Sequence, residues 1–589
     1  MSVVYPGVES AEFSQAFRDL ARAVADLGAL FDEHGIARRE PAPLDEATVR
    51  VFETVVARFN ATLEAASRID AYLYAFVTTD SLDSAAQART SEYEQVDAQL
   101  TQLGTRFTAW VGSLDAEALI QASGVAREHA YPLRRAKVRA THLMSPAEEA
   151  LATEMSITGG SAWSKLWGNV SSQVMVPIER EGKTVELPMS AVRNLAFEPD
   201  REVRRHAYEA EVAAWQRVAV PLAAAMNGVK GEVQLLAKRR GWDSPLDAAL
   251  FLNGIDRQIL DAMIDTVRDY FPVFRRYLRA KARALGLEVL AWYDLFAPVG
   301  AAASRWDFDQ AEDFILAQFG TYSPALRDLA ARAFRERWVD AEPRQGKRGG
   351  AYCMRLRDGE SRIFANYQPT INGVKTLAHE LGHAFHNVQL ADRLPLQRNV
   401  PMVLAETASI FCERIVRQAA LSRADAPEQL VIIESELQDA TQVTVDIVSR
   451  FLFEQAVFER RAQRELAADE LNELMLQAQR DTYGDGLEQA ALHPYQWAAK
   501  PHYYMLEPQY YNFPYAFGQL FGLGMFARYE AEPAAFRANY EEVLSLAGLA
   551  DPVTLAGRFG IDIRNPAFWR SSLEVIREDV DRFEALVGA

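Results

Sequence analysis

Apolar residues recur along much of this sequence at the spacing expected for one face of an amphipathic helix. Between Phe13 and Phe31, six apolar residues follow one another at intervals of three or four positions, which predicts a first long helix. A second stripe of this kind runs from Phe52 to Ala66, and Asp45 stands where it can cap that helix. Alternating patterns typical of strands are scarce, so we predict a mainly α-helical protein.

The first interruption of the helical pattern lies near residue 160. Residues 157–161, Ile-Thr-Gly-Gly-Ser, predict a loop because glycine and serine favour turns over helix interiors. Residues 174–187 then carry the pattern of a short β-hairpin, with Glu181-Gly182-Lys183 as its expected turn. Helical periodicity resumes near Asp200.

A second interruption precedes the most histidine-rich part of the chain. Residues 344–350 form a basic, glycine-rich loop that lacks the Gly-x-x-x-x-Gly-Lys-Ser/Thr spacing of a nucleotide-binding P-loop. Two strand-like segments follow, residues 351–356 and 362–367, and Asp358-Gly359 between them is typical of a hairpin turn. We therefore expect a small sheet here and no nucleotide site.

Composition adds size and environment to this picture. A chain of 589 residues exceeds what one hydrophobic core sustains, so we expect at least two lobes, with a boundary near residue 195. The formal charge of −18 disfavours nucleic acid and anionic membrane surfaces as partners. No apolar run approaches the roughly 18 residues of a membrane span, and the two cysteines, Cys353 and Cys412, fit a reducing compartment. We expect a cytoplasmic protein.

Three of the nine histidines, His379, His383 and His386, fall within eight positions and contain the motif His-Glu-x-x-His. Apolar residues from Val374 to Val388 step by three and four around them, which predicts an amphipathic helix. His379 and His383 then lie one turn apart on a different face, a geometry that lets two imidazoles bind one zinc ion. Glu380 beside them is placed to reach a metal-bound water, and a buried helix with hydrogen-bonded histidines is the alternative.

A catalytic zinc site typically has three protein ligands and one open position. Position 389 is Gln389, which excludes the metzincin arrangement with a third histidine there. A carboxylate on a second helix is the other solution, and the helix that Pro401 introduces contains Glu406 and Glu413 on one face. We predict Glu406 as the third ligand and Glu413 as a residue that orients a ligand histidine, with a solvated helix face as the alternative for Glu413.

The run His-Glu-Leu-Gly-His-Ala-Phe-His at residues 379–386, followed by Glu-Thr-Ala-Ser at 406–409, resembles the thimet-oligopeptidase-like zinc metallopeptidase family, peptidase family M3. It is most similar to the oligoendopeptidase F branch of that family. Residues 349–353, 483–485 and 500–518 are also similar to this branch. The resemblance covers roughly residues 110–580.

This resemblance implies a mainly α-helical body of two lobes around a deep substrate channel, with a zincin-type active-site helix and a small β-sheet. It implies an N-terminal helical region at residues 1–110, an oligoendopeptidase F-like N-terminal domain at 111–195 and a catalytic domain at 196–589. Family members cleave internal bonds of short unfolded peptides, so oligopeptides are the expected partners and one zinc ion per chain the expected cofactor. Oligomeric state is not predicted.

The resemblance also assigns roles to individual residues. Zinc held by His379, His383 and Glu406 would activate a water whose proton Glu380 accepts. His502 matches the histidine that faces the substrate in this branch. The chain has extra residues between His502 and Tyr510 and carries Phe513 where other members have tyrosine. We place the oxyanion donors at Tyr510 and Tyr511, and assign Tyr515 to substrate binding.

Residues 362–367 precede the motif helix and are predicted to form either an edge strand or an ordinary buried strand. As an edge strand they would pair with an extended peptide through Arg362, Phe364, Ala365 and Asn366.

Two other functions share parts of this pattern. A helical zinc carboxypeptidase or dipeptidyl carboxypeptidase would need a cation such as Arg348 or Arg362 for the terminal carboxylate of its substrate. A non-catalytic peptide-binding scaffold should lack Glu380 or one of the ligands, and all are present.

Overall fold

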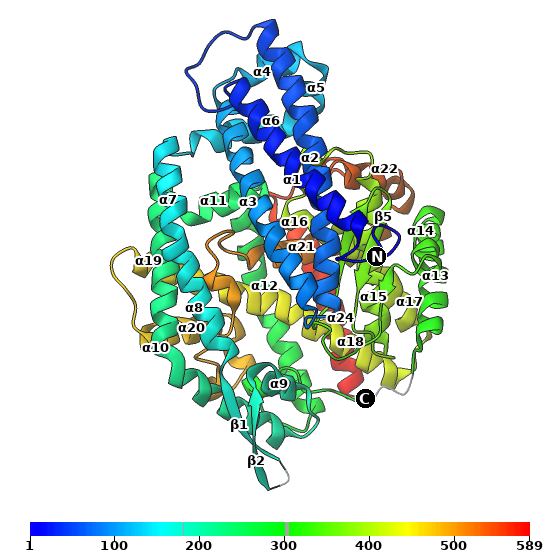
Figure 1. Ribbon diagram of the computed structural model, residues 1–589. Coiled ribbons are helices and arrows are strands. Elements are labelled where there is room, and N and C mark those ends of the chain that lie inside the picture. The colour runs from blue at the N-terminus through cyan, green and yellow to red at the C-terminus, as the bar shows by residue number, and fades with distance from the viewer. Residues whose placement is uncertain (181, 301–304, 589) are drawn as a thin grey trace.

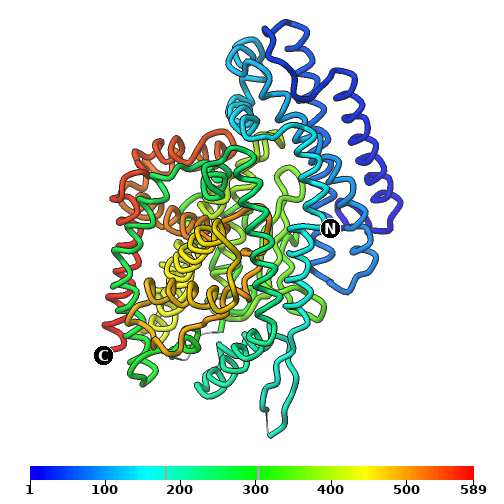
Figure 2. The backbone as a smooth tube through the Cα atoms, turned by 90° about the vertical axis from the view of Figure 1, so that its left-hand side faces the viewer, coloured from blue at the N-terminus to red at the C-terminus, as the bar shows by residue number. Residues whose placement is uncertain are grey.

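The computed structural model describes residues 1–180, 182–300 and 305–588 and is mainly helical, as predicted (Figure 1). Figure 2 shows the N-terminal helices packed against one side of a larger body. The apolar side chains of residues 8–133 form a core of their own, separate from the larger core that residues 229–583 build. The expected division into two lobes is therefore confirmed.

The N-terminal lobe consists of α1 (Ala11–Glu33), α2 (Glu46–Thr79), α3 (Ser84–Gly112), α4 (Ala116–Ala122), α5 (Gly124–Glu128) and α6 (Ala130–Thr141). Both predicted helices are confirmed. The apolar stripe of α1 is buried from Phe13 to Phe31. At the start of α2, Asp45 accepts a hydrogen bond from the backbone N–H of Thr48 at 2.7 Å, which is the capping role expected for it.

The middle of the chain comprises α7 (Pro146–Thr158), α8 (Gly160–Ser172), β1 (Met175–Arg180), β2 (Lys183–Pro188), α9 (Met189–Asn194) and α10 (Arg201–Arg239). The prediction of a loop at residues 157–161 is wrong, because α7 and α8 nearly abut at Gly159. The two glycines are needed for close packing. A Cβ on Gly160 would lie 2.3 Å from the Leu506 side chain, and one on Gly159 would lie 2.5 Å from the Glu232 carboxylate.

The predicted hairpin at residues 174–187 is confirmed. β1 and β2 pair in antiparallel register from Met175 with Pro188 to Arg180 with Lys183. Glu181 of the expected turn lies outside the described residues.

The larger lobe contains most of the remaining chain. Its helices are α11 (Pro245–Asn253), α12 (Arg257–Ala284), α13 (Phe308–Tyr322), α14 (Pro324–Arg335), α15 (Ile371–Gln389), α16 (Met402–Ala405), α17 (Thr407–Arg423), α18 (Ala426–Thr441), α19 (Ile447–Arg461), α20 (Ala468–Tyr483), α21 (Phe513–Ala531), α22 (Pro533–Ser545), α23 (Pro552–Gly557) and α24 (Pro566–Gly588). Short 3-10 turns lie at Leu195–Phe197, Trp292–Asp294, Pro395–Gln397, Gly484–Gly486, Gln489–Ala491 and Pro501–Tyr504, and a π-helical turn, Gln442–Asp446, joins α18 to α19.

A three-stranded sheet packs beside α15. It contains β3 (Val339–Asp340), β4 (Tyr352–Arg357) and β5 (Glu360–Phe364) in the order β3-β5-β4. The β4–β5 hairpin confirms the turn expected at Asp358-Gly359. Because β3 pairs with β5 in parallel, β5 is the central strand and β4 lies at an edge. Of the two alternatives for this segment, residues 362–364 therefore form the ordinary buried strand and not an edge strand, and residues 365–367 lie beyond its end.

The basic, glycine-rich loop at residues 344–350 joins the two lobes. Its backbone contacts the end of α2, where Arg348 N–H donates to the Thr78 carbonyl at 2.9 Å and Ser81 N–H donates to the Gly346 carbonyl at 2.8 Å. Lys347 points inward and donates to the Ala365 carbonyl at 2.7 Å. The basic residue Lys347 therefore fastens this loop to the sheet.

No helix among the described residues combines the length and apolar character that crossing a membrane requires.

Candidate metal centre and catalytic residues

The motif helix α15 buries one face and leaves its two motif histidines partly accessible. Val374, Leu377 and Leu381 are buried, as the apolar stripe predicted. The side chains of His379 and His383 are 24% and 21% exposed, so a ligand can reach both rings. The spacing of four residues places the rings in edge-to-face contact with their centroids 5.0 Å apart.

Glu406 lies at the break between α16 and α17, not inside one continuous helix as expected. α17 crosses α15 closely because position 382 is glycine: a Cβ there would lie 2.6 Å from the Ala408 carbonyl oxygen. This approach brings Oε2 of Glu406 to 3.2 Å from Nε2 of His379 and to 3.4 Å from Nε2 of His383. Ser409 donates a hydrogen bond to the same oxygen at 2.7 Å.

The electrostatics of this group favour a bound cation. One donor atom from each of His379, His383 and Glu406 lies within 4.8 Å of the other two, which suits a single metal ion. Burial disfavours charge here, yet contacts with Glu406 and Glu413 raise the pKa of His379 to about 10. Burial also opposes ionisation of Glu406, but the two histidines hold the pKa of its carboxyl well below the usual range. Two imidazoles and a carboxylate are donors that zinc commonly accepts in catalytic sites.

Glu380 faces the same region and lacks a fixed partner. Burial raises the pKa of its carboxyl, and Oε2 of Glu380 is buried without a hydrogen-bond partner among the described residues. Buried polar atoms in native proteins are rarely left unpaired, so such an atom suits a water or substrate proton.

Glu413 contacts the far side of the first motif histidine. Its Oε2 lies 3.1 Å from Nδ1 of His379, so the carboxylate can accept a hydrogen bond from Nδ1–H and leave Nε2 facing Glu406. Lys375 lies 3.3 Å from Glu413 and 2.6 Å from Asp439. Sequence reasoning missed Lys375, although its position four residues before His379 places it on the same side of the helix.

A histidine and two tyrosines, His502, Tyr511 and Tyr515, form a cluster of ring contacts. The ring centroids of His502 and Tyr511 are 5.1 Å apart, and those of Tyr511 and Tyr515 are 5.5 Å apart. α21 approaches Glu406 closely, since a Cβ on Gly518 would lie 3.1 Å from the Cβ of Glu406. Tyr515, one turn earlier on α21, is therefore close to the metal group.

Tyr510 does not join this cluster. Its side chain is buried, and its ring packs against Phe451 and Phe458 with centroids 5.6 and 5.4 Å away. The backbone φ of Tyr510 is +52°, in the left-handed region, so the adjacent Tyr510 and Tyr511 enter different surroundings. We therefore do not retain Tyr510 as an oxyanion donor.

The residues at 362–367 that were expected to bind substrate are buried or bound to other parts of the protein. Phe364 and Ala365 are buried in the sheet, and Arg362 pairs with Glu360 at 2.6 Å. The Asn366 side chain donates to the carbonyls of Arg348 and Gly350. Because β5 is a central strand, Arg362 and Phe364 have no open strand edge to offer a peptide, and Ala365 and Asn366 lie beyond the end of β5.

A mainly helical protein with a His-Glu-x-x-His helix facing a carboxylate on a second helix is of the metallopeptidase class. The model of one protein family, described as peptidase family M3, matches residues 194–575. The chain belongs to this family. The protein is a metallopeptidase that hydrolyses peptide bonds.

Known relatives agree with this assignment. The chain is 26% identical to Group B oligopeptidase PepB of Streptococcus agalactiae over 456 residues, which is 76% of this chain and 75% of that protein. It is 24% identical to an Oligoendopeptidase F homolog of Lactococcus lactis over 535 residues, 88% of this chain and 87% of that protein. Oligoendopeptidase-F from Enterococcus faecium shares the fold with a TM-score of 0.72 at 18% identity, covering 98% of this chain and 99% of the other.

Proposed function

We propose that this protein is a zinc-dependent oligoendopeptidase that hydrolyses internal bonds of short unfolded peptides. The convergence of His379, His383 and Glu406 beside the unpartnered carboxylate of Glu380 carries the proposal. The names of the relatives, oligopeptidase and oligoendopeptidase F, support the substrate class.

The three proposed ligands would hold one zinc ion. When bound, zinc acts as a Lewis acid on the scissile carbonyl and lowers the pKa of a water molecule to about 7. Glu413 keeps His379 oriented through its contact with Nδ1, and Ser409 does the same for Glu406.

Glu380 is the proposed general base. Its free Oε2 can accept the proton of the attacking water and later deliver it to the leaving amine. Because burial raises the pKa of this carboxyl, Glu380 holds the transferred proton more readily than an exposed glutamate does.

His502, Tyr511 and Tyr515 are the proposed donors to the negative oxygen that develops on the substrate. Burial and the charges of Arg450 and Lys500 lower the pKa of His502 to about 4, so the ring is neutral near pH 7 and still carries one N–H donor. The raised pKa of Tyr515, caused mainly by burial, keeps its hydroxyl protonated. Such fixed donors stabilise charge in the transition state more than in the ground state.

Cleavage of internal bonds is favoured over removal of C-terminal residues. Of the two cations considered for a carboxypeptidase, Arg362 is paired with Glu360, whereas Arg348 is exposed. The preference for internal bonds therefore rests on the names of the relatives, oligoendopeptidase F among them. The domain divisions near residues 110 and 195, the deep channel between the lobes and the cytoplasmic location remain predictions.

Peptides blocked at both termini test this function. A series from about five to thirty residues would be digested and the products read by mass spectrometry. We expect cleavage at internal bonds of the short members and slow cleavage of the longest ones. Cleavage restricted to peptides with a free C-terminus would contradict endopeptidase activity, and equal rates for a denatured full-length protein would contradict a narrow channel.

A further inference from the structure

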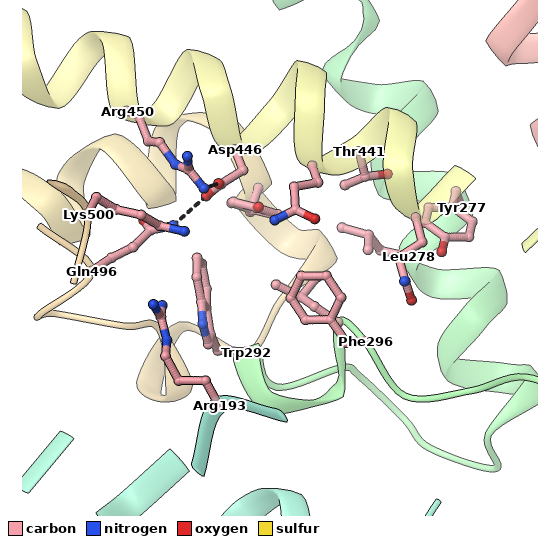
Figure 3. Close-up of a pocket in the computed structure, with 14 residues that line it drawn as sticks. Arg193, Tyr277, Leu278, Trp292, Phe296, Thr441, Asp446, Arg450, Gln496 and Lys500 are labelled. Carbon is pink, nitrogen blue, oxygen red and sulfur yellow. Dashed lines mark hydrogen bonds and ion pairs between the residues drawn. The ribbon is translucent and has the colours of Figure 1, made fainter. Parts of the chain in front are cut away.

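A partly enclosed pocket of about 70 Å³ lies beside the π-helical turn that joins α18 to α19 (Figure 3). Leu278 and Phe296 form an apolar wall, and Arg193, Arg450 and Lys500 bring three cationic side chains to the other side. This volume accommodates a small ion or a few water molecules and is too small for a large organic ligand. π-Helical turns occur frequently at functional sites.

The charges around the pocket do not balance. Arg193 pairs with Glu211 at 3.0 Å, and Arg450 pairs with Asp446. The Gln496 side chain also donates a hydrogen bond to Oδ1 of Asp446 at 2.6 Å, so Asp446 has two partners. Among the described residues, no carboxylate forms an ion pair with Lys500. Asp446 and Glu211 act on its ammonium from nearby, but each already pairs with an arginine.

One further group in the pocket lacks a partner. Nε of Arg450 is buried and has no hydrogen-bond partner in the described parts of the chain. Burial and the nearby Arg450 charge lower the pKa of the Lys500 ammonium to about 7. Lys500 is half-buried, and an unpaired cation that is partly removed from water has a free-energy cost that a bound anion relieves.

We propose that this pocket binds one small anion of halide or carboxylate size, held by Lys500 together with Arg193 and Arg450. Figure 3 shows the side chains of Lys500 and Arg193 on the same side of the Trp292 ring, which places both near the polar end of the pocket. None of the proposed metal ligands lines this pocket. Lys500 lies two residues before His502, so the anion also steadies the segment that carries this histidine.

Thermal unfolding of the full-length protein tests the proposal. The melting temperature would be measured at constant ionic strength while sodium gluconate, whose anion is too large for the pocket, is replaced by sodium chloride or sodium acetate. We expect a rise of about 1–2 °C that grows with anion concentration and saturates. A wild-type melting temperature that does not respond to either anion would overturn the proposal.

Lys500→Met removes the charge and keeps a side chain of similar length. We expect this variant to lose the response to chloride and acetate, because the half-buried cation that the proposal places on the anion is gone. Lys238→Met, at an exposed position of α10, is the matched control and should respond like wild type. A response in Lys500→Met equal to that of wild type would overturn the assignment.

Two sources of the anion are distinguished by kinetics. If the terminal carboxylate of a peptide is the natural ligand, a free-acid peptide has a lower KM than its C-terminal amide in wild type, and the difference disappears in Lys500→Met. If a free anion is the ligand, the two peptides have equal KM values while the melting response persists. Melting needs no turnover, so failure of this proposal is separable from failure of the proposed peptidase activity.

Discussion

Oε2 of Glu413 lies 3.1 Å from Nδ1 of His379, on the side of the imidazole opposite Glu406. This contact fixes the tautomer in which Nε2 is free to bind a metal ion. Lys375 in turn contacts Glu413 at 3.3 Å and Asp439 at 2.6 Å, so the chain of contacts extends from α15 to α18.

Glu413→Gln is therefore expected to weaken zinc affinity by about 10–100-fold, because the neutral amide accepts the hydrogen bond from Nδ1–H of His379 less strongly than the carboxylate does. Zinc affinity would be measured by competition with a chromophoric chelator. Asp439→Asn changes the contact of Asp439 with Lys375, which does not touch His379 directly, and should lower zinc affinity less. Equal affinities for wild type and Glu413→Gln would show that this contact does not support metal binding.

The double variant Tyr511→Phe, Tyr515→Phe should lower kcat by about 10²–10³-fold with little change in KM, because the lost hydroxyls act on the transition state. Tyr510→Phe is the matched control, since Tyr510 packs between Phe451 and Phe458 and should keep near-wild-type kcat. Steady-state kinetics on a fluorogenic peptide measures both. A large loss in Tyr510→Phe with none in the double variant would reverse the assignment.

Gly382→Ala should destabilise the protein by about 1–3 kcal/mol, because the added methyl group meets the backbone of α17 at 2.6 Å. The same displacement would separate Glu406 from the two histidines, so zinc affinity should fall as well. Gly168→Ala in α8 is the control: nothing lies within 4 Å of the added Cβ, and helix propensity favours alanine. Denaturant unfolding with zinc present would rank the three proteins, and equal stability of Gly382→Ala and wild type would contradict the close crossing.

Glu211 gives the fold a pH-dependent contribution. Burial alone would raise the pKa of this carboxyl, but His493, Arg193 and Trp215 lower it to about 2. A lowered carboxyl pKa stabilises the fold above the unfolded value of 4.5, and this stabilisation is lost as the pH falls toward 2. Glu211→Gln should therefore destabilise the protein more at pH 7 than below pH 4.5, as measured by denaturant unfolding at several pH values. A destabilisation that does not change with pH would contradict this account.

Local patterns predicted the elements that local forces determine. The stripe of α15 fixed which face is buried, and the spacing of four residues placed His379 and His383 on one side. The carboxylate of Glu406 was predicted from motif spacing, and the glycine that lets α17 approach is part of the same motif. The sequence holds no local indication of the break in the helix at Glu406 itself.

Other features depend on contacts that no local pattern encodes. The two-residue strand β3 is too short to show an alternation of polar and apolar residues. Its pairing with β5 nevertheless makes β5 the central strand and leaves β4 at an edge of the sheet. The left-handed backbone at Tyr510 separates two adjacent tyrosines that look equivalent in the sequence. The anion pocket draws its charges from Arg193, Arg450 and Lys500, which lie far apart along the chain.

Glu380→Gln tests the central claim most directly, because it removes the proposed base and leaves the three proposed ligands in place. Zinc content by mass spectrometry and turnover of a doubly blocked peptide would be measured on the same preparation. We predict one zinc ion per chain, as in wild type, and a fall in kcat of about 10²–10⁴-fold. Turnover within tenfold of wild type in the zinc-loaded variant would contradict the account.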